Sequence, residues 1–231
     1  MKKVLLLTST GLASLFVSYC SQAVTFDYRH EVKPEESMNA DRFLISHTFE
    51  NNLSISSEAK WGGYASGDRP YDDLVSRGNE LGIGYKYKVN DKLDLQPSAS
   101  IDSGKDASTY KFNLKGSYKL PYNFYIAERY RYGDKEKEAT KTTEHYHQSD
   151  FYVGYTWNQF KFEYDFVFKK TDYQSYKNTH RDYEHNFCIQ YKVDSHWTPF
   201  TEIGYVPYKP TGGVYGDEWQ ARYRIGVKYN L

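Results

Sequence analysis

The chain has 231 residues, of which 30 are basic and 30 acidic, and its mean hydropathy is −0.82. This neutral balance gives no reason to expect a nucleic-acid partner, and no later segment is long and apolar enough for a transmembrane helix. Aromatic residues make up 18% of the chain, and 25 of them are tyrosines spread evenly along it. Two classes remain: a secreted soluble protein, and a protein that crosses a membrane as strands.

The N-terminus has the pattern of a secretory signal peptide. Lys2 and Lys3 precede an apolar run at 4–17, and residues 21–23 read Ser-Gln-Ala, with small residues at −3 and −1. We expect cleavage after Ala23, so that residues 1–23 are the signal peptide and 24–231 form one domain.

The two cysteines bear on this boundary. A rival interpretation makes Cys20 the lipid-modified residue of a lipoprotein, but the large Tyr19 precedes it, where such signals favour a small residue. Cleavage after Ala23 leaves only Cys188, so we expect no disulfide within the mature chain.

Apolar and polar residues alternate along the whole mature chain. In the first expected strand, 24–31, apolar Val24, Phe26 and Tyr28 alternate with polar residues. Similar strands are expected at 42–49, 53–61, 80–89, 93–101, 110–120, 124–132, 151–157, 160–168, 185–193, 198–206 and 221–231. This makes about twelve strands of roughly nine to eleven residues, which is the length that a tilted strand needs to cross a bilayer.

The connections between these strands also alternate in length. Tight turns are expected at 50–52, 90–92, 120–123, 158–159 and 194–196, and longer polar loops at 62–79, 133–150 and 170–182. Short turns at one end and long loops at the other are typical of outer-membrane barrels.

We therefore predict an all-β fold, a closed antiparallel transmembrane barrel with short periplasmic turns and long extracellular loops. Closure is required because lipid cannot satisfy the backbone groups of an open edge. The alternative is a soluble sandwich or barrel that buries the apolar face, but large aromatic residues on every strand would overfill such a core.

The last residues, 221–231, fit the membrane interpretation. Tyr223, Ile225 and Leu231 lie on one face, and the opposite face carries Arg222 and Arg224. This resembles the C-terminal signature by which outer-membrane barrels are recognised for insertion, although phenylalanine is commoner than leucine at the final position. The expected location is the bacterial outer membrane, with its lipid as a partner.

The inward face of such a barrel would carry an excess of basic residues, with acids such as Glu136, Glu138 and Glu218 concentrated in the loops. A narrow pore of this kind favours anions, and arginine pairs carboxylates bidentately. The candidate residues of the pathway are Arg29, Arg42, Lys111, Lys115, Arg129, Arg131, Arg222 and Arg224. The alternative is that these side chains merely fill the lumen by pairing with acids such as Asp27, Glu58 and Glu163.

Glu128 is at odds with the pattern because alternation places it on the outward face. Either it lies near the membrane rim or the strand carries a bulge, and the sequence leaves both open.

Five segments together resemble one known family, the oligogalacturonate-specific porins of the KdgM family, which also includes a sialic-acid channel. The matching segments are 24–31, 41–61, 128–132, 196–204 and 221–231. The resemblance implies a monomeric twelve-stranded barrel that passes acidic sugars, such as uronate oligomers from pectin, along basic tracks. It carries that role onto Arg129 and Arg131, Arg222 and Arg224 in two Arg-Tyr-Arg motifs, and onto Arg29 and Arg42.

A barrel enzyme and a structural barrel are the two alternatives to a passive channel. A barrel enzyme could draw on His145, His147, His180 and His185 with loop acids, yet no third metal ligand, glycine-rich phosphate loop or cysteine–histidine spacing is present in the sequence. A structural barrel would need a blocked lumen. We expect a diffusion channel for acidic oligosaccharides, with no catalysis and no cofactor, whether the sugar is an oligogalacturonate or another acidic sugar such as sialic acid.

Overall fold

The computed structural model describes residues 24–64, 74–175, 179–208 and 218–231. The expected signal peptide, 1–23, and parts of the expected loops 62–79 and 170–182 lie outside these ranges. Within them no helix has the length and apolar character needed to cross a membrane.

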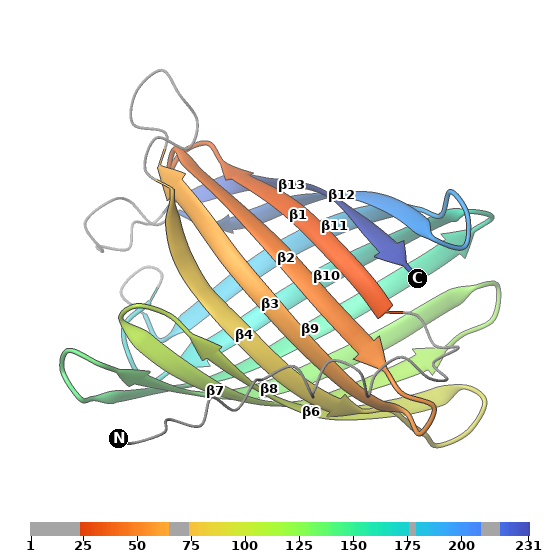
Figure 1. Ribbon diagram of the computed structural model, residues 1–231, viewed down its shortest axis with the longest axis horizontal. Coiled ribbons are helices and arrows are strands. Elements are labelled where there is room, and N and C mark those ends of the chain that lie inside the picture. Colours follow the sequence, from red (N-terminus) through yellow and green to blue (C-terminus); the bar gives the residue numbers. More distant parts are fainter. Residues whose placement is uncertain (1–23, 65–73, 176–178, 209–217) are drawn as a thin grey trace, which may run out of the picture.

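The described residues form one antiparallel sheet that curls into a barrel (Figure 1). Its strands are β1 (Val24–Lys33), β2 (Met38–Thr48), β3 (Leu53–Tyr64), β4 (Val75–Tyr85), β5 (Tyr87–Lys88), β6 (Leu93–Ser103), β7 (Ala107–Lys119), β8 (Phe124–Lys137), β9 (Thr143–Trp157), β10 (Phe160–Thr171), β11 (Arg181–Tyr191), β12 (Trp197–Pro207) and β13 (Trp219–Asn230).

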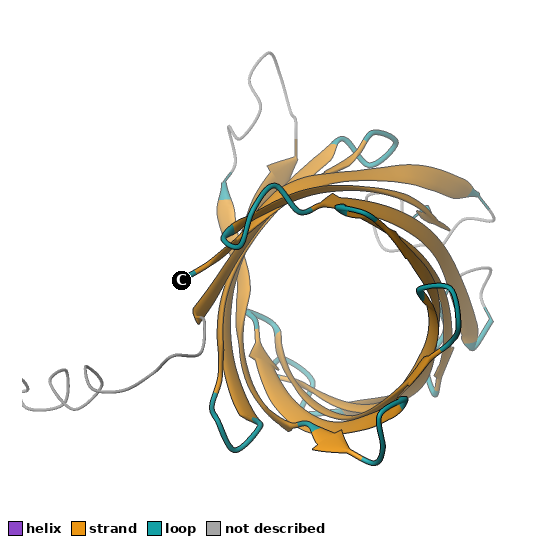
Figure 2. Cartoon of the chain, turned by 90° about the vertical axis from the view of Figure 1, so that its right-hand side faces the viewer, coloured by secondary structure: helices purple, strands orange, loops and turns teal. Residues whose placement is uncertain are grey.

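The sheet closes because its first and last strands pair with each other. β1 runs antiparallel to β13, with Phe26 opposite Tyr229 and Val32 opposite Tyr223. The backbone N–H of Leu231 donates to the carbonyl of Val24 at 3.0 Å, so the two ends of the described domain meet. Figure 2, viewed along the barrel, shows the closed ring of strands.

The predicted twelve-stranded barrel is confirmed, with β4 and β5 sharing one position beside β6. The break falls at Lys86, whose backbone N–H donates to the carbonyl of Asn52 in the β2–β3 turn at 3.0 Å. The expected strand 80–89 is thus present, with an interruption at Lys86.

The tight turns gather at one end of the barrel, here called the short-turn end, which also holds Val24 and Leu231 (Figure 1). Asn52, Asn123 and Asn158 in these turns have φ of 66°, 63° and 52°. Asparagine tolerates this left-handed conformation better than other residues with a Cβ, so the turn residues seen in the sequence have a direct geometric reason.

The outward face is apolar from strand to strand. Leu81, Phe112, Ile203 and Ile225 expose 64%, 57%, 56% and 64% of their surface, which only a hydrocarbon surrounding makes favourable. The exposed set also includes Ile45, Ile55, Ile83, Ile101, Leu114, Ile126, Phe151, Val153, Phe187 and Tyr223.

Strands β8 and β9 are longer than predicted. Most of the expected loop 133–150 is strand, and only 138–142 connects the two. The polar composition of 133–150 predicts a loop, but its charges pair across the two strands: Lys135 lies 3.5 Å from Glu144, which also pairs with Lys137.

Glu128 lies on the outward face without a bulge. It stands opposite Gly116 of β7 and Phe151 of β9, and the pairing of β8 is continuous on both sides. The bulge that the sequence left open is therefore not present in β8.

Candidate functional site

The inner wall of the barrel carries all eight candidate cations. Alternation places their side chains opposite the exposed apolar set, on β1, β2, β7, β8 and β13. The structure divides them by their partners into five that are paired with carboxylates and three that are not.

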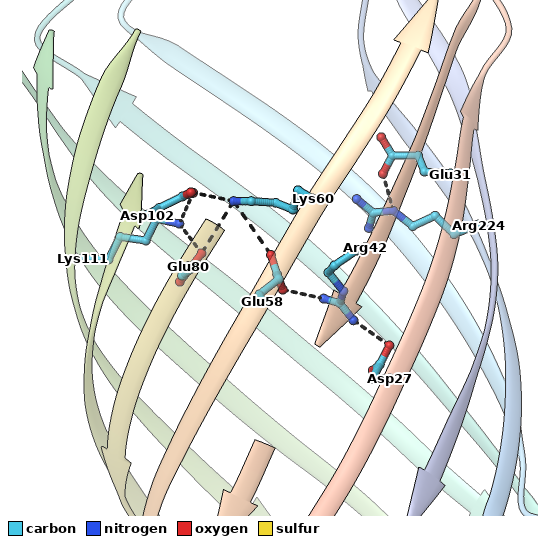
Figure 3. Close-up of polar contacts among 9 residues, drawn as sticks. All are labelled: Asp27, Glu31, Arg42, Glu58, Lys60, Glu80, Asp102, Lys111 and Arg224. Atoms are coloured by element: carbon cyan, nitrogen blue, oxygen red, sulfur yellow. Dashed lines mark hydrogen bonds and ion pairs between the residues drawn. The ribbon is translucent and has the colours of Figure 1, made fainter. Parts of the chain in front are cut away.

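A chain of ion pairs crosses the wall from β1 to β7 (Figure 3). Its members are Asp27, Arg42, Glu58, Lys60, Glu80, Asp102 and Lys111. At its β1 end, Arg42 donates to Asp27 at 2.8 Å and lies 3.5 Å from Glu58. Two carboxylates thus hold this guanidinium from both sides.

The other end of the chain is a box of two amines and two carboxylates. Lys111 donates to Glu80 at 2.7 Å and to Asp102 at 2.9 Å. Lys60 donates to Asp102 at 2.7 Å and lies 4.0 Å from Glu80. The positive charge of Lys111 is therefore compensated by two carboxylates in direct contact with it.

Arg224 and Arg222 of the last strand form a second paired group. Arg224 donates to Glu31 and to Glu202, each at 2.6 Å. Arg222 is 6% exposed, lies 3.2 Å from Glu184 and shares Glu202 at 3.6 Å. The Arg224–Glu31 pair joins β13 to β1, across the seam where the barrel closes.

Arg129 belongs to a third paired group. Its guanidinium lies 2.5 Å from Asp150, a side chain with no exposed surface. Gln148 donates to the other oxygen of the same carboxylate at 2.7 Å. Arg129 thus neutralises the buried charge of Asp150, and Gln148 supplies a further hydrogen bond to it.

Arg29, Lys115 and Arg131 have no carboxylate within 4.0 Å among the described residues. Arg131 donates to the amide oxygen of Asn113 at 2.7 Å, and the amine of Lys115 lies 4.6 Å from the centroid of the Tyr152 ring. Arg29 stands opposite Arg42, and its Nε is buried without a hydrogen-bond acceptor among those residues. None of these three cations is in direct contact with a carboxylate, while Glu163 acts on Lys115, and Glu31 and Glu202 act on Arg29, at longer range.

Two cavities open on the inner wall. One of about 340 Å³ lies against Arg129 and Arg131 and is otherwise lined mainly by serines and glycines. Another of about 230 Å³ also touches Arg129, together with Arg222, Arg224 and several acids. Arg129 therefore lies between a mainly uncharged, hydroxyl-rich space and one lined by both cations and acids.

The expected concentration of acids in the loops is wrong for this wall. Carboxylates on the strands hold five of the eight candidates, and the loop residue Glu138 pairs locally with Lys141 at 2.8 Å. Alternation signals Glu31 and Glu202 as inward residues, but Asp150 was missed because it lay within an expected loop.

The four histidines considered for an enzyme do not converge. His145 and His147 lie on β9 and bond Tyr132 and Tyr130 on β8 at 2.9 and 2.5 Å, while His185 on β11 bonds Tyr164. His180 lies 3.2 Å from the carbonyl of Thr171. The described part of the chain holds no group of three His, Cys, Asp or Glu side chains that could bind a metal ion.

Comparison with known proteins supports a channel. The family model described as oligogalacturonate-specific porin protein (KdgM) matches residues 17–231. The chain is 34% identical to the oligogalacturonate-specific porin KdgM of Dickeya dadantii, over 99% of this chain and 100% of that protein. The chain belongs to the KdgM family of porins. It is thus a porin of the bacterial outer membrane, as its relatives are.

Two further relatives bear on what such porins carry. The N-acetylneuraminic acid outer membrane channel NanC of Escherichia coli K12 is 24% identical over the full length of both chains. The solved structure of the KdgM porin in complex with disordered oligogalacturonate has a TM-score of 0.66 and 29% identity, and covers 90% of this chain and 99% of that one. The KdgM-family barrel therefore has relatives associated with two acidic sugars.

Proposed function

We propose that this KdgM-family porin is a passive, anion-selective channel for acidic oligosaccharides, oligogalacturonates in particular. The observation that carries the proposal is the presence of Arg29, Lys115 and Arg131 on the inner wall without carboxylate partners. Cations in a pore that no carboxylate contacts raise the local concentration of anions and lower the barrier to their passage.

The paired cations have a different role in this proposal. Four of them link nearby strands of the sheet through carboxylates and contribute little net charge to the lumen: Arg42, Lys111, Arg222 and Arg224. Of the eight candidates, Arg131 has the best position for a solute carboxylate, because it lines the larger polar cavity and its partner Asn113 is neutral.

The proposal is tested by the reversal potential of the refolded protein in a planar bilayer under a salt gradient, followed by addition of trigalacturonate. We expect anion selectivity and current block by the trisaccharide. Combined replacement of Arg29, Lys115 and Arg131 by glutamine should move the reversal potential towards that of a non-selective pore and weaken the block.

The matched control replaces three exposed cations outside the wall, Lys88, Lys105 and Lys141, by glutamine. This control should leave both readouts unchanged. A reversal potential that is the same in the wall variant and in the unmodified protein would remove the three residues from the pathway. Stronger block by sialic acid than by trigalacturonate would assign the channel to the other acidic sugar instead.

Three further points belong to the proposal. The chain acts without catalysis, so incubation with the trisaccharide should release no shorter product. It functions as a monomer, which the mass of the detergent-solubilised protein would test. Removal of the signal peptide would leave Val24 as the first residue, and N-terminal sequencing of protein from outer membranes would show it.

A further inference from the structure

A patch of small polar side chains covers the inner wall near the short-turn end and borders the ion-pair chain, whose Glu80 accepts a hydrogen bond from Ser100. We call it the hydroxyl wall. It consists of Ser46, Thr48, Ser54, Ser56, Gly82, Gly84, Ser98 and Ser100 on β2, β3, β4 and β6.

Strand register makes this patch continuous. Ser56 lies opposite Ser46 on one side and Gly82 on the other, and Gly82 lies opposite Ser100. The neighbouring row runs in the same way through Ser54, which lies opposite Thr48 and Gly84, and then to Ser98. Two parallel rows thus cross four adjacent strands, with hydroxyl groups on β2, β3 and β6 and a glycine on β4 in each row.

Gly82 and Gly84 leave room on the inner wall for the neighbouring serine side chains. A Cβ atom built on Gly82 would lie 2.6 Å from the hydroxyl oxygen of Ser56, and one on Gly84 would lie 2.9 Å from that of Ser54. The hydroxyls of Ser56 and Ser54 therefore lie over the two glycines, in the space that a larger residue at 82 or 84 would need.

The cavity of about 340 Å³ lies between the hydroxyl wall and three side chains of β7 and β8, which are Asn113, Arg129 and Arg131. Glu80 is the acidic residue on its lining, and it is bonded to Lys111 at 2.7 Å. One side of this space is thus neutral and rich in hydroxyls, and the other presents guanidinium groups.

This contrast matches the chemistry of a uronate unit, which carries one carboxylate and several ring hydroxyls. A serine hydroxyl both donates and accepts hydrogen bonds, so it can pair with sugar hydroxyls in either orientation. Cations alone would bind any anion of equal charge, whereas a surface that pairs with hydroxyls rejects a solute that lacks them.

Resting on the proposed function, we propose that the hydroxyl wall is the sugar-recognising half of the pathway. It would bond the ring hydroxyls of a uronate while Arg131 binds the carboxylate, and it would separate acidic sugars from other carboxylates of equal charge.

The test replaces Ser54, Ser56, Ser98 and Ser100 by alanine and compares two blockers with three carboxylates each. Trigalacturonate carries ring hydroxyls, and tricarballylate has none. Loss of several hydrogen bonds should weaken block by trigalacturonate by about tenfold. Block by tricarballylate and the reversal potential should stay as in the unmodified channel, because no charge has been removed.

Ser57→Ala is the matched control, since Ser57 neighbours Ser56 and its side chain points to the opposite face of β3. If the fourfold variant fails to fold, judged by its mobility on unheated gels, the two rows are replaced separately, at Ser54 and Ser98 and at Ser56 and Ser100.

Unchanged trigalacturonate block in a folded variant, or equal weakening of both blockers, would overturn the role of the hydroxyl wall and leave the anion channel intact. A different result, in which the unmodified protein is neither anion-selective nor blocked by trigalacturonate, would refute the proposed function itself.

Discussion

Arg129 and Arg131 are two residues apart on the same face of β8, yet their surroundings differ. Arg129 neutralises the buried Asp150, whereas Arg131 bonds the neutral Asn113. Removing a partner from a buried ion pair leaves an uncompensated charge, which is costly, while removing a cation from a neutral partner is not. Arg129 should therefore contribute mainly to the stability of the barrel, and Arg131 mainly to its ion selectivity.

We expect Arg129→Gln to lower the free energy of unfolding by about 3 kcal/mol and Arg131→Gln to change it little. Conversely, Arg131→Gln should shift the reversal potential towards cations. Urea unfolding in lipid vesicles and bilayer recordings on the same two variants check both expectations. Equal destabilisation by the two changes would contradict the distinction, and so would a larger shift in reversal potential for Arg129→Gln.

Glu128 is the second residue whose replacement should change the stability of the barrel in a predictable direction. Its side chain is exposed on the lipid face, four residues into β8, with Phe151 and Gly116 opposite. A carboxylate in the hydrocarbon layer is unfavourable, though less so than a lysine or arginine. We expect Glu128→Leu to raise the free energy of unfolding in vesicles by about 1 kcal/mol.

Glu128→Gln serves as the control because it removes the charge and keeps the size, and it should give part of the gain. The same changes in detergent micelles with long polar headgroups should matter less. A loss of stability in Glu128→Leu would mean that the carboxylate has a favourable partner in the membrane.

At the level of single residues, the sequence identified the inward cations but not the side chains that they contact. Alternation identified the inward cations because each face of a strand takes every second residue. It could not say that Arg42 meets both Asp27 and Glu58, because those contacts depend on how three strands are aligned. Which cations stay uncompensated is a property of that alignment and cannot be read along the chain.

At the scale of elements, the twelve strands were predictable because a membrane imposes both the period and the length. The prediction failed at 133–150, where β8 and β9 extend as a paired ribbon. Lipid no longer selects an apolar face there, so the alternation that marks a membrane strand fades while the backbone pairing continues. Strand ends outside the bilayer are therefore harder to predict than strand centres.

The last strand allows a test of membrane depth. Ile225 lies in the middle of β13 and is 64% exposed, whereas Leu231 follows the strand at the short-turn end and is 62% exposed. A lysine on the lipid face costs about 2–4 kcal/mol at the bilayer centre and about 0–1 kcal/mol near an interface. We expect Ile225→Lys to be much more destabilising than Leu231→Lys in vesicle unfolding.

Both residues have similar exposure, so the difference isolates depth from the loss of apolar surface. Ile225→Ser controls for that loss and should have an intermediate effect. Equal destabilisation by the two lysine substitutions would show that the centre of β13 does not face the hydrocarbon layer.

At the scale of the whole molecule, closure turns a neutral chain into a pore with an uneven charge. The chain carries equal numbers of basic and acidic residues, but most inward carboxylates are used to pair cations of neighbouring strands. The field in the lumen then comes mainly from the cations that no carboxylate contacts, and it acts over distances set by dissolved salt.

This origin of selectivity predicts a dependence on ionic strength. The screening length falls from about 10 Å at 0.1 M salt to about 3 Å at 1 M. A field from Arg29, Lys115 and Arg131 across the lumen should therefore favour anions strongly at 0.1 M and weakly at 1 M. Reversal potentials at a fixed salt ratio and several mean concentrations would measure this, and the variant that lacks the three cations should show a flatter profile than the unmodified protein. An anion preference that is constant from 0.1 to 1 M would mean that ions are selected by direct contact, which is screened little, and would shift the basis of selectivity to the paired arginines.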